Sequence, residues 1–191
     1  MLSVPDQVLL IVVGTTALAL ILFFIFSLWD QIRAAVLNEA PFVSAPEEAI
    51  DDIVAALDPQ VGDAVYDLGC GDGIVLRALH AANPKARYIG IEKGMIPFVT
   101  AKWRCKHLPR RAVKIRRDDF FETDLCPANK VYVYLYAHVL DMLLPKFKRE
   151  LPKGAIVVSL DYQFSDRKPD KVITLDHRGG ARGRRLSVYR F

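Results

Sequence analysis

The longest apolar stretch of the chain lies near its start and contains no charged residue. It runs from Val8 to Trp29 and is interrupted only by Gly14, Thr15, Thr16 and Ser27. As a helix with a rise of about 1.5 Å per residue, it would be roughly 33 Å long, enough to cross a hydrocarbon core of about 30 Å. It is longer than the apolar core of a cleaved signal peptide, and no Lys or Arg precedes it. The pattern predicts one uncleaved transmembrane helix.

Beyond this stretch, the apolar positions alternate between strand spacing and helical spacing. Runs rich in β-branched residues predict strands at 64–68, 87–92, 113–116, 131–136, 155–160, 171–175 and 186–190. Apolar positions at helical spacing predict helices at 46–57, 74–82, 97–106 and 139–150. Alternating strands and helices favour an α/β fold with a mostly parallel sheet, closed by an antiparallel pair across the glycines at 179–183.

The first of these helices has a start signal in the sequence. Ser44 precedes Glu47 by three residues, with Pro46 between them, which is the pattern of a capping box. We therefore expect Ser44 to cap the helix. The patterns divide the chain into an anchor at 1–35, a linker with a leading helix at 36–60, and a ligand-binding domain at 61–191.

Charge is distributed unevenly along the chain, whose formal net charge is +4. Residues 1–100 hold 5 basic and 12 acidic residues, whereas residues 101–191 hold 21 and 10. The basic residues cluster in two groups: Lys106, Arg110, Arg111, Lys114, Arg116 and Arg117, and then Arg178, Arg182, Arg184 and Arg185. In a tethered domain such groups attract anionic lipid headgroups, or they are simply solvated. No nucleic-acid-binding motif accompanies them, so nucleic acid is not expected as a partner.

Flanking residues and cysteines indicate the compartment. Arg33 follows the apolar stretch and no basic residue precedes it, which favours a cytoplasmic position for the domain. Cys70, Cys105 and Cys126 are odd in number and match no metal-ligand spacing, so we expect a reducing compartment and no metal site. The start is not the Arg-rich and Ser-rich segment of a transit peptide, so a bacterial inner membrane is favoured over a mitochondrial one.

The most informative motif is a strand that runs into a turn with glycine at every second position, Gly69, Gly71 and Gly73. Glycines let the backbone turn sharply and let a ligand approach it closely. Neither phosphate-binding motif is complete, because position 74 is isoleucine and no Gly-Lys-Ser/Thr follows. Asp72, beside the expected helix N-terminus, would repel a pyrophosphate and suits a ligand with positive charge.

A second acid supports the same kind of ligand. Glu92 ends the second expected strand, 19 residues after Gly73. An acid about 20 residues after such a loop can accept hydrogen bonds from ribose hydroxyls. A nucleoside with cationic groups and no phosphates describes S-adenosyl-L-methionine, which is the predicted cofactor.

Asp67-Leu68-Gly69-Cys70-Gly71-Asp72-Gly73, followed by Glu92, resembles the first motifs of the class I methyltransferase family. The resemblance implies a Rossmann-like sheet and assigns Glu92 to the ribose, Asp119 to the adenine amino group and Phe120 to the adenine ring. It implies that the rest of the cofactor is bound along the loop, by Asp67, Gly69, Cys70, Gly71 and Gly73.

Three further segments, together with the anchor, resemble the membrane-associated protein-lysine methyltransferases of the ATP synthase c-subunit and adenine nucleotide translocase type and their prokaryotic relatives. The segments are 40–46, 119–125 and 151–164. In that family the Pro-Phe-Val segment, here within 40–46, forms a loop over the cofactor. The resemblance implies a protein substrate associated with the membrane.

Methyl transfer is an in-line displacement, so the protein mainly aligns the nucleophile and excludes water. A lysine nucleophile must lose a proton from a group with an unperturbed pKa of about 10.4, which an apolar aromatic channel favours. Tyr136 and Tyr162 follow the fourth and fifth expected strands and are candidates for that channel, as are Tyr134 and Phe164, although aromatics in this position also serve as core. His138 and Asp161 are candidates for taking up or relaying the proton.

Three functions are consistent with the sequence. The first is an anchored protein-lysine N-methyltransferase, whose tether raises the local concentration of a membrane substrate. The second is a methyltransferase for a membrane lipid or quinone, which would need a roofed apolar pocket. The third is a scaffold that binds the cofactor without catalysis. The sequence indicates no oligomeric state.

Overall fold

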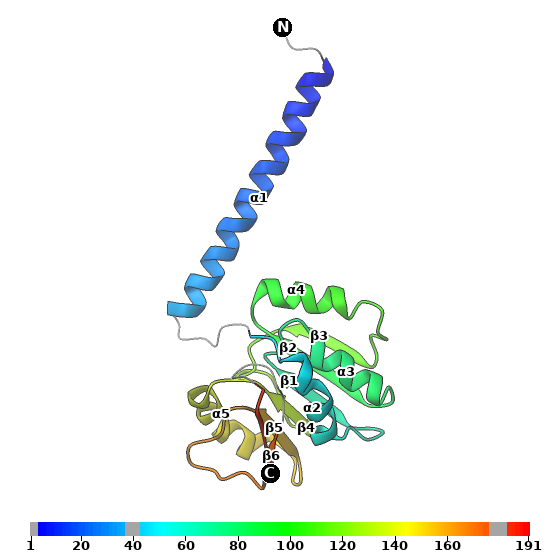
Figure 1. Ribbon diagram of the computed structural model, residues 1–191, viewed down its shortest axis with the longest axis vertical. Helices are drawn as coiled ribbons and strands as arrows, with labels where there is room; N and C mark the ends of the chain where they lie inside the picture. Colours follow the sequence, from blue (N-terminus) through cyan, green and yellow to red (C-terminus); the bar gives the residue numbers. More distant parts are fainter. Residues whose placement is uncertain (1–3, 37–42, 176–182) are drawn as a thin grey trace. The chain divides into compact units, whose positions relative to one another are not determined.

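The structure is a computed structural model, and it describes residues 4–36, 43–175 and 183–191 (Figure 1). It separates into two compact units, Met1–Pro41 and Phe42–Phe191. The predicted loop residues 40–42, the glycines at 179 and 180, and Arg178 and Arg182 lie outside the described residues.

The described residues of the first unit form one helix, α1 (Val4–Val36). Its apolar part, Val4–Trp29, has a mean hydropathy of 2.9, and none of it is buried inside the protein. The predicted apolar helix is thus confirmed, with a length and composition that suffice to cross a membrane. Exposing such an apolar surface to water is unfavourable.

The second unit is built on one seven-stranded sheet. Its strands are β1 (Ala64–Leu68), β2 (Arg87–Glu92), β3 (Val113–Arg117), β4 (Lys130–Val133), β5 (Ile156–Leu160), β6 (Lys171–Thr174) and β7 (Arg185–Arg190). The order is β3-β2-β1-β4-β5-β7-β6, in which the first five strands are parallel and β7 runs antiparallel to both of its neighbours. The predicted α/β fold with an antiparallel closing pair is confirmed.

Helices cover both faces of this sheet. They are η1 (Glu47–Ala49), α2 (Ile50–Leu57), α3 (Ile74–Ala82), α4 (Met95–Arg104) and α5 (Ala137–Glu150). Helices α2 and α3 pack on the face that carries Val65 and Tyr88. On the opposite face, Tyr189 of β7 meets Phe164, which in turn meets Phe147 of α5. The alternation of side chains along each strand supplies both cores.

The capping prediction for Ser44 is wrong. The chain enters α2 through the short 3-10 turn η1, and neither element has a side-chain cap. The hydroxyl of Ser44 instead donates to Asp72 Oδ2 at 3.4 Å. The tight turn closes with a backbone bond from Ala49 N–H to Pro46 O at 3.0 Å, so the helix begins beyond the reach of the serine.

Several element ends also differ from the prediction, by one to three residues. Strand β4 ends at Val133 rather than at 136, because Tyr136 becomes the N-cap residue of α5. Helix α4 begins two residues earlier than expected, at Met95, which places Pro97 in its first turn. Proline is tolerated there because the first N–H groups of a helix have no partner within the helix.

Candidate active site

The carboxyl ends of β1, β2 and β4 meet at one edge of the sheet. Asp67 of β1 is the register partner of both Gly90 in β2 and Tyr132 in β4. The strand order reverses direction between β1 and β4, and such switch points are where open α/β sheets bind ligands. The topology therefore brings together Asp67, the glycine loop and Glu92.

The glycine loop is fixed against β2 by its backbone. The N–H groups of Gly69 and Cys70 both donate to the carbonyl oxygen of Ile91, at 2.9 and 3.0 Å. Gly69, Gly71 and Gly73 have φ of +78°, +55° and +78°, a conformation that is costly for other residues. A Cβ at Gly73 would also lie 3.1 Å from Cys105 Sγ, so this glycine is needed for packing beside α4.

Glu92 lies directly against the loop. Its Oε2 accepts a hydrogen bond from Gly71 N–H at 3.0 Å, and its Oε1 accepts one from Gly94 N–H at 2.7 Å. A carboxylate can accept from more than these two donors, so it can also bind hydroxyl groups. Gly94 is a residue that the sequence analysis missed, although a glycine two positions after the strand-ending acid was the available signal. The two backbone donors fix the direction in which the carboxylate points.

Asp67 is buried, and its Oδ2 has no hydrogen-bond partner in the described part of the chain; nor does the hydroxyl of Tyr132, on the neighbouring strand. Burial raises the pKa of the Asp67 carboxyl well above its usual value, and the charges of Glu92 and Asp72 raise this pKa further. A buried polar atom without a partner is costly and rare in folded proteins. A cationic ligand group beside Asp67 would offset the cost of burying the carboxylate charge and its repulsion by Glu92 and Asp72.

Asp72 already has a cationic partner within the protein. Its Oδ2 is 2.6 Å from Arg104 Nη1 and also accepts from Ser44, while its Oδ1 accepts from Ile74 N–H at 3.2 Å. The interpretation of Asp72 as an attractor for a positive ligand is therefore replaced by an ion pair that fixes the loop to α4. Arg104 lies 32 residues further along the chain, and no local pattern could have identified it.

Asp119 and Phe120 follow β3, beside the end of β2. Asp118 N–H donates to the carbonyl oxygen of Glu92 at 3.3 Å, which joins the two strand ends. The carboxylate of Asp119 pairs with Lys93 at 3.1 Å and accepts from Phe121 N–H at 2.9 Å. Phe120 and Phe121 lie half-buried with ring centres 4.8 Å apart. The assignment of Asp119 and Phe120 to adenine stays a prediction.

Aromatic side chains gather where β4 and β5 end. The ring of Tyr162 lies 5.2 Å from Tyr136, in an edge-to-face arrangement, and 6.2 Å from Tyr134. His138 stacks on Tyr136 at 6.0 Å and is exposed. The structure thus brings together three of the predicted channel residues, whereas the fourth, Phe164, is buried in the core.

Asp161 is bound mainly by backbone groups. Its two carboxylate oxygens accept from the backbone N–H groups of Gly183 and Arg184, at 2.7 and 2.8 Å. Tyr134 Oη lies 3.4 Å from Asp161 Oδ2. Asp161 also has φ of +61°, which the surrounding bonds must hold. It positions the 183–184 backbone and the aromatic group together.

Comparisons with known proteins show which family this chain resembles. The model of the ANTKMT methyltransferase domain matches residues 67–171. A protein-lysine N-methyltransferase of Saccharolobus islandicus (strain REY15A) is 33% identical over 139 residues, which are 71% of this chain and 85% of that protein. The adenine nucleotide translocase lysine N-methyltransferase of Mus musculus is 30% identical over 139 residues, which are 71% of this chain and 58% of that protein.

A solved structure shares the fold as well. It is an RNA methyltransferase from Salinibacter ruber in complex with S-adenosyl-L-homocysteine, with a TM-score of 0.69 and 28% identity. The match covers 78% of this chain and 93% of that one.

Proposed function

The chain belongs to the ANTKMT methyltransferase family, and we propose that it is an S-adenosyl-L-methionine-dependent protein-lysine N-methyltransferase that α1 anchors in a membrane. The observation that carries the chemistry is the presence of two carboxylates at the glycine loop: Glu92, held by two backbone donors, and the buried Asp67, whose Oδ2 has no hydrogen-bond partner among the described residues. The lysine substrate follows from the family and from the relative of Saccharolobus islandicus.

The residues present fit the cofactor. S-adenosyl-L-methionine, when bound, supplies a methyl group on a positively charged sulfur. Glu92 would accept from the ribose hydroxyls, and Asp67 would face the cationic methionine end. The loop of Gly69, Cys70 and Gly71 would approach closely through its backbone. Asp119 and Phe120 would hold the adenine.

The aromatic group formed by Tyr134, Tyr136 and Tyr162 would receive the lysine side chain. Aromatic walls stabilise the neutral amine relative to the ammonium form, because they provide little solvation for a charge. Tyr136 and Tyr162 would align the amine with the methyl carbon and exclude water. His138, exposed on Tyr136, would take up the proton or pass it to solvent, and Asp161 would keep the group in position.

The membrane assignment rests on α1. Its apolar part, Val4–Trp29, finds no protein contact that buries it. A tether would confine the enzyme and a membrane-associated protein substrate to one surface and raise their effective concentration. Arg33 at its end favours a cytoplasmic domain, in a bacterial inner membrane or alternatively a mitochondrial membrane.

The direct test is the transfer of labelled methyl groups from S-adenosyl-L-methionine by the purified full-length protein. The acceptor would be membranes from a strain that lacks the protein, with protein and lipid fractions counted separately. We expect label in a protein band, placed on lysine by mass spectrometry. Label in the lipid fraction would contradict the proposal in favour of a small-molecule substrate, and cofactor binding without any transfer would favour a scaffold.

The aromatic group gives a sharper prediction. Tyr162→Ala removes the ring that contacts both Tyr134 and Tyr136, so the amine loses its alignment. Because small misplacements cost up to about 100-fold in rate, we expect kcat to fall by roughly 10- to 100-fold with little change in cofactor Kd. Tyr162→Phe keeps the ring and should retain most of the activity. An alanine variant with unchanged kcat would remove Tyr162 from the channel.

A further inference from the structure

Helix α4 turns apolar side chains outward. Of its ten residues only Ala101 is buried, whereas Val99 is 54% exposed and Trp103 is 64% exposed. Residues four positions apart lie on one side of a helix, so Val99 and Trp103 form one apolar strip. Burying an exposed tryptophan and valine is favourable, and this strip therefore has the chemistry of a contact surface.

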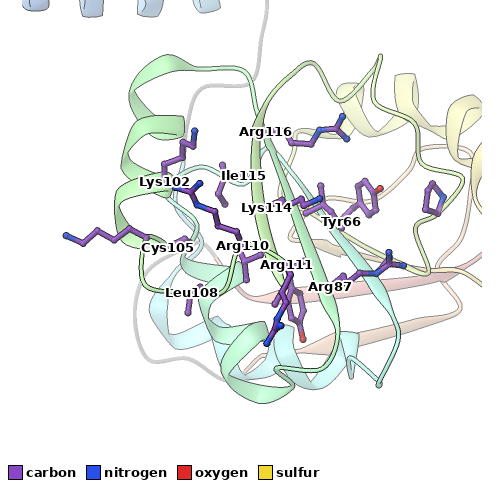
Figure 2. Close-up of a pocket in the computed structure, with 17 residues that line it drawn as sticks. Tyr66, Arg87, Lys102, Cys105, Leu108, Arg110, Arg111, Lys114, Ile115 and Arg116 are labelled. Carbon is purple, nitrogen blue, oxygen red and sulfur yellow. The ribbon is translucent and has the colours of Figure 1, made fainter.

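Basic side chains border this strip. Lys102 Nζ lies 5.0 Å from the ring centre of Phe98, and Lys106 Nζ lies 5.1 Å from that of Trp103. These contacts place the two ammonium groups over aromatic rings, in cation–π geometry. Arg110 and Arg111 follow in the segment between α4 and β3, and with Lys102 and Lys106 they line one cavity of about 770 Å³. Figure 2 shows Lys102, Arg110 and Arg111 beside this cavity.

Within the described part of the chain, no ion pair balances most of the charges of this surface. Of the neighbouring cations, Arg104 pairs with Asp72 and Lys93 pairs with Asp119. Among the described residues no ion pair includes Lys102, Lys106, Arg110 or Arg111. We call the α4 surface the set of residues Val99, Lys102, Trp103, Lys106, Arg110 and Arg111. It combines four uncompensated positive charges with an exposed tryptophan.

This combination selects one kind of partner. A tryptophan flanked by lysines is typical of segments that lie at a membrane interface, where the ring enters the headgroup region and the ammonium groups meet lipid phosphates. An acidic protein segment would balance the charges, but acidic side chains would not cover the apolar strip. Seven backbone steps join Val36 to Val43, so the connection between the units extends at most about 25 Å. A membrane that holds α1 is thus always available to the domain at high local concentration.

We propose that the α4 surface docks on the anionic headgroup region of the membrane in which α1 is anchored. The inference rests on the anchoring proposed above. Docking would also act on the active site, because Gly94 begins α4 as its N-cap residue and donates to Glu92. The end of β2 that carries Glu92 would then be held near the membrane surface, where lysines of membrane proteins emerge.

The test uses the only two tryptophans of the chain, Trp29 and Trp103. In the full-length W29F variant, Trp103 alone reports on its surroundings. The protein would be reconstituted into nanodiscs of neutral phosphatidylcholine with or without anionic phosphatidylglycerol, and quenching by lipids brominated near the headgroup would be compared with quenching by acrylamide. Resistance of the protein to alkaline extraction from vesicles would be measured first, because it tests the anchor separately.

We expect brominated lipid to quench Trp103 in anionic discs and much less in neutral discs or at high salt. Each basic residue near an anionic surface contributes about a fivefold change in the docking equilibrium, so K102Q/K106Q in the W29F background should lower it about 25-fold. The matched control K148Q/K153Q removes two exposed lysines elsewhere in the domain and should have no such effect.

Two outcomes would overturn the proposal while α1 still resists extraction. Trp103 could stay open to acrylamide and unquenched by lipid in every disc. Alternatively, K102Q/K106Q could leave lipid quenching unchanged and instead weaken methylation of a soluble acidic substrate, which would assign the α4 surface to protein recognition. Failure of α1 to resist extraction would contradict the anchor itself.

Discussion

Glu92→Ala is expected to weaken the binding of S-adenosyl-L-methionine at least about 100-fold and to remove methyl transfer at ordinary cofactor concentrations. Hydrogen bonds to a charged acceptor contribute about 1.5–3 kcal/mol each, and the ribose offers two hydroxyls. The substitution also leaves the N–H groups of Gly71 and Gly94 without their acceptor, so the loop loses its fixed conformation. Isothermal titration with S-adenosyl-L-methionine and S-adenosyl-L-homocysteine measures the loss.

Two controls separate recognition from folding in this experiment. Glu92→Gln keeps one acceptor oxygen and should fall between the wild type and the alanine variant. Glu150→Ala removes an acid that is paired with Lys146 on α5, away from the cofactor loop, so it should lower stability without changing cofactor affinity. A Kd for Glu92→Ala within about threefold of the wild type would show that Glu92 is not the ribose acceptor.

Asp67→Asn is expected to uncouple stability from function. The folded state raises the pKa of the Asp67 carboxyl well above its usual value, so the folded protein holds this proton more tightly than the unfolded chain does. Stability is therefore lost as pH rises from the unfolded pKa of about 3.9 through the raised folded pKa. The neutral amide has nearly the same shape and removes this penalty, whereas it cannot balance the cationic end of the cofactor.

We expect the unliganded Asp67→Asn protein to melt at a higher temperature than the wild type at neutral pH, by about 2–4 °C for each kcal/mol gained. The difference in Tm should shrink as pH is lowered and should vanish below the unfolded pKa of about 3.9, because the wild-type carboxyl is then protonated in both states. Cofactor binding and methyl transfer should fall at least about 100-fold, because hydrogen bonds and ion pairs to a buried charge are strong. Thermal melts across pH and titration calorimetry test the two halves. A lower Tm at every pH would mean that the carboxylate stabilises the loop.

The strands and helices could be predicted from the sequence because the local pattern of apolar residues shows which positions are buried. Runs such as Ala64–Leu68 and Ile156–Leu160 are apolar except for Asp67 and Ser159, and strands covered on both faces need a largely apolar composition. Capping failed as a local rule at Ser44, since a serine can be used by any acceptor within reach and the fold brings Asp72 to it. The start of a helix depends on the path of the backbone that leads into it, and neighbouring residues do not determine that path.

The candidate site, too, could be predicted only in part. Its residue types could be predicted, because a glycine loop after a strand and an acid at the next strand end fall at fixed spacings in a βαβ unit. The partners of those residues could not. Arg104 reaches Asp72 from helix α4, 32 residues later, and Asp161 accepts from Gly183 and Arg184, more than twenty residues later.

By itself, the sequence determined the apolar helix, the alternating fold and the identity of the acids and glycines that suit the cofactor, because each depends on periodicity or on short spacing. Only the tertiary structure decided which of the charged groups are compensated. It paired Asp72 with Arg104, buried Asp67 without a partner for its Oδ2, and left Lys102 and Lys106 beside an exposed Trp103. Compensation of charge depends on distances between elements that are remote along the chain, and those distances exist only once the sheet and its helices have packed.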